Sequence, residues 1–242
     1  MTMRVLILAG GPAVETDAPS VLLAERSGEL LVERIARQLG ELRAQMIFVL
    51  RQQDIGRHHI DDVVRLAVPG AEIVVIGRET GGAACTALLA VHHFAPDEEL
   101  LVLAANEFLD IDYPQTIAEF RARELDAATV VFPSLHPRYS YVALDDAGLV
   151  VEAAEKRPIS RLAAAGFYWY RRAGDFVDAA EDMIRKDAQV DGAFYLSLTF
   201  NQLVLRQKRI GVREIDGRRY IPLKSKHQIA VYEGEISGER TR

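Results

Sequence analysis

The sequence predicts an α/β fold with a mixed, mainly parallel central sheet, helices on both faces and a small antiparallel insert. Residues 4–9 (RVLILA) form an apolar run without alternation, which is typical of a strand buried on both faces of a parallel sheet. Strand-like and helix-like segments then alternate to about residue 135. After residue 140 two short strand-like segments flank Asp145-Asp146-Ala147-Gly148, a hairpin turn signal that predicts the insert.

The individual elements follow from the spacing of the apolar residues. Strands are predicted at Met46–Leu50, Glu72–Ile76, Leu100–Ala104 and Ala127–Phe132, and the hairpin strands at Tyr141–Leu144 and Val150–Ala153. Helices are predicted at Ser27–Leu42, Ile60–Leu66, Thr86–Phe94 and Ile117–Glu124.

Composition restricts the class of protein. A chain of 242 residues fits one large domain, here 1–242, with halves 1–135 and 136–232 and a loose tail at 233–242. The net charge of −6 argues against a nucleic-acid partner. Cys85 is the only cysteine, so no internal disulfide forms and a cytoplasmic location is expected. No apolar segment is long enough to span a bilayer, so no membrane partner is expected.

A glycine pair follows the first strand. Glycine lets a backbone turn sharply and approach a ligand, so Leu8, Ala9, Gly10 and Gly11 are a candidate nucleotide-binding segment. The segment matches neither the dinucleotide G-x-G-x-x-G pattern nor the P-loop, because Pro12-Ala13-Val14-Glu15 follows it. A purely structural turn remains the alternative.

Further segments occur together with the glycine pair in one order. They are LILAGG (6–11), ETGGAACTALLA (79–90), LVLAANEFLDID (101–112), EKRPIS (155–160), GFYWY (166–170) and GAFYLSLTFNQL (192–203). This series resembles the sugar-phosphate nucleotidyltransferases (nucleotide-sugar pyrophosphorylases), especially short capsule-associated members. The resemblance implies a Rossmann-like, GT-A-like nucleotide-diphospho-sugar transferase fold.

The resemblance also implies a reaction and a set of site residues. A nucleoside triphosphate and a sugar phosphate, or a related phosphorylated metabolite, would react with release of pyrophosphate and with Mg²⁺ as cofactor. The implied roles are nucleotide binding by Leu8, Ala9, Gly10, Gly11, Gly81, Gly82 and Ala83, catalysis and acceptor-phosphate binding by Glu155 and Lys156, metal binding by Asn106, Glu107 and Asp110, and sugar contact by Tyr141, Gly166 and Asn201.

Several charged positions depart from the family pattern. After Gly11 no Arg or Lys appears before Arg26, Ser20 replaces the family's lysine, Asn106 replaces an aspartate and His227 replaces an acidic residue. Two alternatives to an active transferase therefore stay open. One is a catalytically inactive nucleotide- or sugar-phosphate-binding regulatory homologue, and the other is a glycosyltransferase that uses Asp110 and Asp112 on a nucleotide-sugar donor.

Each candidate also has a structural interpretation. Gly81 to Ala84 could serve close helix–sheet packing, Glu155-Lys156 could be a solvated pair, and Asp110 to Asp112 could cap a helix. Asn201 could cap local backbone, and a homo-oligomer is a further open alternative.

Overall fold

The four buried strands predicted in the first half form the parallel part of one sheet. The computed structural model describes residues 2–11 and 18–234. In it, β1 (Met3–Ala9) pairs in parallel with β4 (Gln45–Arg51) and with β6 (Glu99–Ala104), and β5 (Glu72–Ile76) extends the sheet beyond β4. Apolar side chains on both sides of β1, β4 and β6 are buried, which explains why these strands show no alternation, whereas β5 is an edge strand with Val75 51% exposed. This part of the predicted fold is confirmed.

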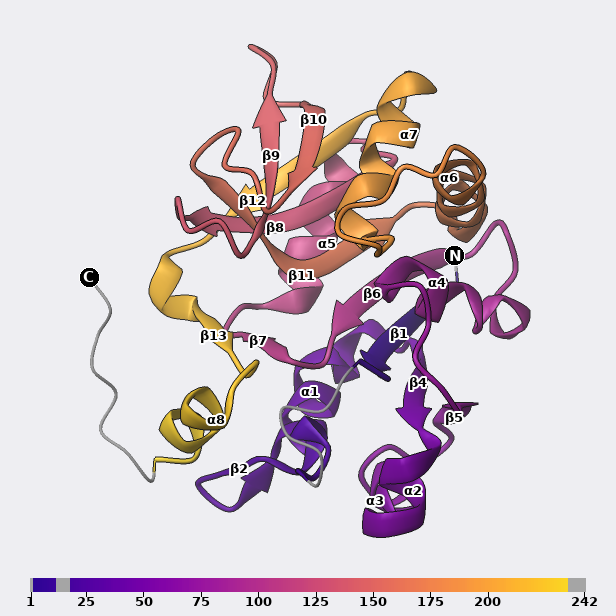
Figure 1. Cartoon of the computed structure of the whole chain (residues 1–242), viewed down its shortest axis with the longest axis vertical. Helices are drawn as coiled ribbons and strands as arrows, with labels where there is room; N and C mark the ends of the chain where they lie inside the picture. The colour runs from indigo at the N-terminus through magenta and orange to yellow at the C-terminus, as the bar shows by residue number, and fades with distance from the viewer. Residues whose placement is uncertain (1, 12–17, 235–242) are drawn as a thin grey trace.

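The second half of the chain continues the sheet with antiparallel pairs. β11 (Leu162–Tyr170) lies antiparallel to β6 and to β8 (Ala127–Pro133), and β12 (Ile210–Glu214) is parallel to β8. The predicted hairpin is present as β9 (Ser140–Leu144) and β10 (Val150–Glu155), and it joins β11 through one residue pair. All these strands belong to one nine-stranded sheet (Figure 1).

Two layers of helices cover the sheet. One apolar cluster joins Val5 and Ile7 of β1 to α1 (Leu31–Leu39) and α5 (Tyr113–Ala122), and it also takes in α3 (Ile60–Ala67). The other joins Leu6 to α4 (Ala83–Leu88), α6 (Ala173–Arg185) and α7 (Thr199–Leu205). Because neighbouring residues of β1 belong to opposite clusters, the sheet is buried on both faces. α2 (Gln52–His58) follows β4 directly.

Three predicted helices differ from the structure, and one of them, predicted at Ile117–Glu124, begins four residues earlier and ends two residues earlier as α5. Residues 27–30 form no helix, because Ser27 and Gly28 have positive φ values of 57° and 77° and turn the chain between β2 (Glu25–Arg26) and β3 (Glu29–Leu30). α1 therefore begins at Leu31. The helix predicted at Thr86–Phe94 begins three residues earlier as α4 and ends at Leu88, followed by a 3₁₀ turn at Val91–His93.

The C-terminal segment returns to the middle of the molecule. β13 (Tyr220–Pro222) pairs antiparallel with β7 (Glu107–Leu109), and α8 (Lys226–Glu233) follows it with Ser225 as the N-cap. The buried Tyr232 ring packs against the guanidinium groups of Arg26 and Arg34, at 5.6 and 5.8 Å from the ring centre. These contacts hold α8 against β2 and α1 (Figure 1). The predicted loose tail lies mostly outside the described residues.

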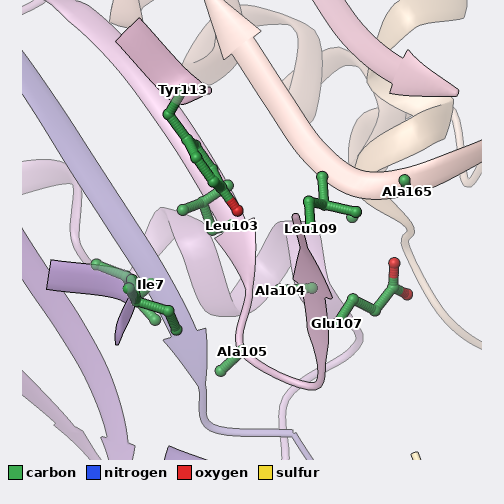
Figure 2. Close-up of a pocket in the computed structure, with 10 residues that line it drawn as sticks. Ile7, Leu103, Ala104, Ala105, Glu107, Leu109, Tyr113 and Ala165 are labelled. Atoms are coloured by element: carbon green, nitrogen blue, oxygen red, sulfur yellow. The ribbon is translucent and has the colours of Figure 1, made fainter. Parts of the chain in front are cut away.

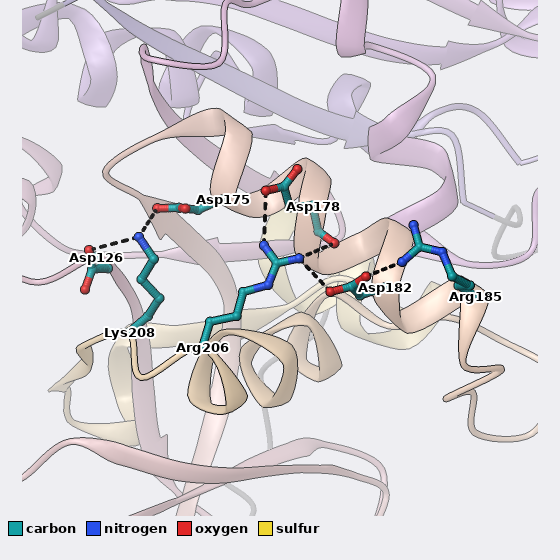
Figure 3. A network of polar contacts seen from close by, with 7 residues as sticks. All are labelled: Asp126, Asp175, Asp178, Asp182, Arg185, Arg206 and Lys208. Carbon is teal, nitrogen blue, oxygen red and sulfur yellow. Dashed lines mark hydrogen bonds and ion pairs between the residues drawn. The ribbon is translucent and has the colours of Figure 1, made fainter.

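A surface ion-pair network joins α6, α7 and the ends of the neighbouring strands (Figure 3). Arg206 pairs with Asp178 at 3.1 Å and with Asp182 at 2.6 Å, while Lys208 pairs with Asp175 at 3.1 Å and Asp126 at 3.6 Å. Each pair is partly exposed to solvent, so each contributes little to the free energy of unfolding. The role of the network is to position α7 relative to α6. In the described part of the chain, no helix is long and apolar enough to cross a membrane.

Candidate functional site

The glycine pair after β1 lies beside the turn that follows β6. Leu8 pairs with Ala104 across the sheet, and its carbonyl accepts a hydrogen bond from the Ala105 amide at 3.1 Å. A Cβ added at Gly10 would lie 2.5 Å from the end of the Ile76 side chain, whereas one at Gly11 would have no atom of the described residues within 4 Å. Glycine at position 10 therefore leaves room for Ile76, and Gly11 follows the carboxyl end of β1. The acidic loop 12–17 lies outside the described residues.

The second glycine pair is held by backbone contacts with a distant segment. Gly82 has a φ of +124°, and an added Cβ would lie 2.5 Å from the Phe194 carbonyl oxygen. The Phe194 amide donates to the Gly81 carbonyl at 2.8 Å, and the Ala84 amide donates to the Phe194 carbonyl at 3.1 Å. Only glycine permits this approach at position 82. The segment around Phe194 is therefore in direct backbone contact with Gly81, Gly82 and the start of α4 at Ala83.

Glu155 is a buried carboxylate at the end of β10. It is 8% exposed and accepts hydrogen bonds from the hydroxyls of Ser140 and Ser197. Burial raises its pKa above the ordinary value, and the hydrogen bonds from the two serines oppose that rise. The positive charges of Lys224 and Lys156 also hold the pKa of Glu155 down. Two ammonium groups therefore act on one buried carboxylate.

Lys156 follows Glu155 in a left-handed backbone conformation, with a φ of 55°. Its Nζ donates to the Asp191 carboxylate at 2.8 Å and lies 5.6 Å from the centre of the Tyr195 ring. The hydrogen bond to Asp191 raises the pKa of Lys156, and Tyr195 adds to the rise. Because the lysine side chain is 41% exposed and Asp191 is 68% exposed, a soluble anion can compete for this ammonium.

A second ion pair lies at the start of β7. Glu107 Oε1 is paired with the Nζ of Lys224, and Glu107 Oε2 is buried and has no hydrogen-bond partner in residues 2–11 and 18–234. A Cβ added at Gly166 would lie 2.7 Å from this Oε2, so glycine at position 166 makes room for the carboxylate. Glu107 is also the charged residue in the lining of a small cavity between β1, β6, β7 and β11, otherwise lined by groups such as Ile7, Leu103 and Leu109 (Figure 2).

The three candidate metal ligands lie around the start of β7. Glu107 already has a cation, and Asn106 and Asp110 are exposed residues on either side of β7. In residues 2–11 and 18–234, no group of three or more His, Cys, Asp or Glu side chains is arranged to hold a metal ion. Mg²⁺ is usually held by one or two carboxylates together with waters and substrate phosphates, and the one buried carboxylate here is already neutralised by Lys224. The residues present at this edge therefore do not fit a protein-bound Mg²⁺.

The Asp110–Asp112 pair is also not a free pair of carboxylates. Asp112 Oδ1 accepts a hydrogen bond from the Gln115 amide at 2.8 Å and forms the N-cap of α5. Its structural interpretation as a helix cap is therefore confirmed.

The candidate sugar-contacting residues all have contacts within the protein. The Tyr141 hydroxyl donates to the His136 carbonyl at 2.6 Å and the side chain is buried. The Asn201 side chain bonds both the amide and the carbonyl of Ala153 at 2.8 Å, so it clamps β10 to α7. Gly166 is covered by the Glu107 carboxylate.

Ser20 and His227, the remaining departures from the family pattern, belong to short helices. Ser20 is 5% exposed, and its hydroxyl accepts a hydrogen bond from the Leu22 amide at 3.4 Å. His227 lies in the first turn of α8.

The most prominent residue that the sequence analysis missed is Lys224. It lies far from Glu107 in sequence, and only the β7–β13 pairing brings the two together. Asp191 and Tyr195 were missed for the same reason, although the Gly192-Ala193-Phe194-Tyr195 block was recognised as a segment of interest. In the sequence, nothing around Lys224, which precedes the helix-capping Ser225, distinguishes it from an ordinary surface lysine.

The match to a known family agrees with this geometry. The family model described as nucleotidyl transferase matches residues 17–195, well over half of the chain. The chain belongs to the nucleotidyl transferase family. No curated protein sequence matches it.

Two solved structures are similar to this nucleotidyl transferase over nearly its whole length. A nucleoside-diphosphate-sugar pyrophosphorylase from Vibrio cholerae RC9 has a TM-score of 0.80 at 19% identity, covering 96% of this chain and 99% of its own. A Bacillus anthracis protein, assigned as a glucose-1-phosphate thymidylyltransferase and in complex with a sucrose, has a TM-score of 0.72 at 17% identity, covering 98% of each chain. At these identities the likeness establishes the fold.

Proposed function

We propose that this nucleotidyl transferase moves a nucleoside monophosphate from a nucleoside triphosphate to a sugar phosphate or a related phosphorylated metabolite, and releases pyrophosphate. Membership of the family supports the reaction class, and the names of the two structural neighbours support this class of acceptor. The observation that carries the proposal is the pair of partly exposed ammonium groups, Lys156 and Lys224, whose charges both act on the buried Glu155.

The reaction explains why such a pair is useful. An oxygen of the acceptor phosphate forms a bond to the α-phosphorus of the triphosphate while the bond to pyrophosphate breaks. Both reactants are anions, so catalysis depends on positioning them and on neutralising their charge. Lys156 can bind the acceptor phosphate by exchanging its exposed partner Asp191 for the ligand. Glu155, fixed by two serines, places a buried carboxylate within reach of the charges of both lysines.

The two glycine pairs support nucleotide binding at the carboxyl ends of β1 and β5. A Cβ at Gly11, just after β1, would meet no atom within 4 Å among the described residues, and Gly81, Gly82 and Ala83 follow the end of β5. Ligands of open α/β sheets bind at this end of the strands. This placement supports nucleotide binding between the two glycine pairs.

Pyrophosphate release from a panel of nucleoside triphosphates and sugar phosphates, with and without Mg²⁺, tests the reaction. We expect Lys156→Ala to weaken binding of the sugar phosphate by roughly tenfold to a hundredfold, since it removes a charge-assisted hydrogen bond. Asp191→Asn should strengthen the same binding, because it removes the competing carboxylate. Lys186→Ala is the control, since its ammonium bonds Gln202 at 2.7 Å on the α6–α7 surface. Equal calorimetric affinities for all four proteins would remove Lys156 from the site.

A second candidate function is a non-catalytic nucleotide- or sugar-phosphate-binding protein. It is favoured by the Glu107–Lys224 ion pair, which neutralises a carboxylate at the end of β6. Binding of both ligands to the wild type with no release of pyrophosphate over the whole panel would select this second function.

A further inference from the structure

The Glu107 carboxylate needs a permanent cation. Its side chain is only 8% exposed, one oxygen has no hydrogen-bond partner among the described residues, and the side chain lines a largely apolar cavity. An unpaired charge in such a place is strongly unfavourable. Lys224 supplies the positive charge through its ion pair with Glu107 Oε1.

Hydrogen bonds of the backbone at Leu223 and Lys224 fix the main chain from which the lysine side chain reaches Glu107. The preceding residue, Leu223, donates its amide to the Asn106 carbonyl at 2.9 Å, and Pro222 lies opposite Glu107 in the β13–β7 pair. The Lys224 amide itself donates to the Gln228 side chain at 2.8 Å, at the start of α8. A lysine held in this way loses less conformational entropy when it binds a ligand than one on a free loop.

The same ammonium is accessible from solvent. The Lys224 side chain is 39% exposed while its partner Glu107 is buried. Its Nζ lies 6.0 Å from the centre of the Tyr139 ring, and its charge acts on Glu155. The ammonium is therefore held by one buried carboxylate, is partly exposed to solvent near the Tyr139 ring, and is close enough to Glu155 for its charge to act on that carboxylate.

A divalent cation does not suit this place. Glu107 is already neutralised, and in the described part of the chain no cluster of three acidic, His or Cys side chains surrounds it. A metal ion bound by Glu107 would also have to approach the positive charge of Lys224. The composition of the site favours a fixed monovalent cation over Mg²⁺ or Mn²⁺.

We propose that Lys224 is a ligand-binding residue whose ammonium, held by Glu107, takes the place of a divalent cation at the end of β6 and contacts a phosphate oxygen of the bound ligand. The shared chemistry is a phosphate group, which a nucleotide or a sugar phosphate can supply. The part of the proposal in which Lys224 contacts a phosphate rests on the proposed function. The part in which Lys224 excludes a divalent cation from Glu107 does not depend on any ligand.

The first experiment measures metal binding without any phosphate ligand. Mn²⁺ titrations followed by electron paramagnetic resonance should show no ion whose binding depends on Glu107 in the wild type. Lys224→Met should gain an Mn²⁺ site that depends on Glu107, because the substitution exposes the carboxylate to the metal. Glu107→Gln in the Lys224→Met background should abolish that site again. An Mn²⁺ ion bound by the wild type and lost in Glu107→Gln would overturn the proposal.

The second experiment measures phosphate binding in the presence of a chelator. Calorimetry with inorganic pyrophosphate, a nucleoside triphosphate and a hexose 1-phosphate shows which source of phosphate contacts Lys224. We expect Lys224→Met to weaken at least one of these about tenfold or more, and Lys224→Arg to retain most of the affinity. The Glu107→Gln, Lys224→Met double variant should show the same loss, and it avoids leaving a buried carboxylate unpaired.

The controls separate this proposal from the proposed function. Lys186→Met should bind all three ligands like the wild type. If the wild type binds them with the chelator present and Lys224→Met binds equally well, Lys224 is not a ligand-binding residue. If no phosphate ligand binds the wild type either with the chelator or with Mg²⁺, the proposed function fails, and the Mn²⁺ titrations alone decide whether Lys224 excludes a metal from Glu107. Binding that requires Mg²⁺ would instead overturn the Lys224 proposal.

Discussion

Replacing Gly166 by alanine tests how tightly β11 is packed against the Glu107 carboxylate. Gly166 lies where the pairing of β11 with β8 shifts register, and its φ is +57°. An alanine Cβ would lie 2.7 Å from Glu107 Oε2 and 3.0 Å from the Ala104 Cβ. Two separate costs follow, one from the backbone and one from the crowded side chain.

The two costs can be estimated from the structure. Holding a non-glycine residue in the left-handed region costs about 1–2 kcal/mol. Inserting a methyl group into a filled space costs about 1–3 kcal/mol more. We therefore expect Gly166→Ala to lower the free energy of unfolding by about 2–5 kcal/mol. Gly148→Ala has a matched φ of +74° and nothing within 4 Å of the added Cβ, so it should show only the first cost.

Urea denaturation of the two variants measures the difference between them. The Glu107→Ala background isolates the contact, since it removes the nearest obstacle while Lys224 stays partly solvated. In that background, Gly166→Ala should approach the cost of Gly148→Ala, apart from the remaining contact with Ala104. Equal losses for Gly166→Ala and Gly148→Ala in the wild-type background would refute the close packing of Glu107 against Gly166.

Two further predictions concern the neighbouring strand β10. Asn201→Ala should lower the free energy of unfolding by about 2–4 kcal/mol, because it leaves both polar groups of the Ala153 backbone without their partner, and faster hydrogen exchange of the Ala153 amide would report the loss directly. Glu155→Gln should raise stability at neutral pH. Burial raises the pKa of Glu155, so the folded wild type holds its proton more tightly and loses stability as the pH rises from the ordinary glutamate value of about 4.3 through the raised one. The gain in the variant should vanish at about pH 4 and below, and a gain independent of pH would contradict this assignment.

Runs of consecutive apolar residues were enough to predict the parallel strands β1, β4, β5 and β6, and such runs are typical of strands in parallel sheets. The bounds of the strands β11 and β12 were not predicted. The hairpin β9–β10 was predicted from its turn residues, since Gly148 takes the positive φ that such a turn needs. The β2–β3 turn was missed, because the helical spacing of the apolar residues nearby outweighed the single Ser27-Gly28 signal.

Parts of the candidate site were also visible in the sequence. The Glu155-Lys156 block and the segment around Phe194 were singled out as blocks, and the structure brings them together through the Lys156–Asp191 pair. Their roles toward a ligand stay predictions. The two interpretations of Asn201 were a sugar contact or a bond to local backbone, and its two hydrogen bonds to Ala153 fit the second.

The amino-acid sequence by itself determined the α/β class, the parallel strands and the family resemblance, because these depend on residues close together in the chain. Only the tertiary structure decided which charges meet. Glu107 and Lys224 are separated by most of the second half of the chain, and their pairing depends on β13 returning to β7. Gly166 is needed because a carboxylate from another strand fills the space beside it. Electrostatic and steric contacts of this kind act through space, so a linear pattern of residues does not contain them.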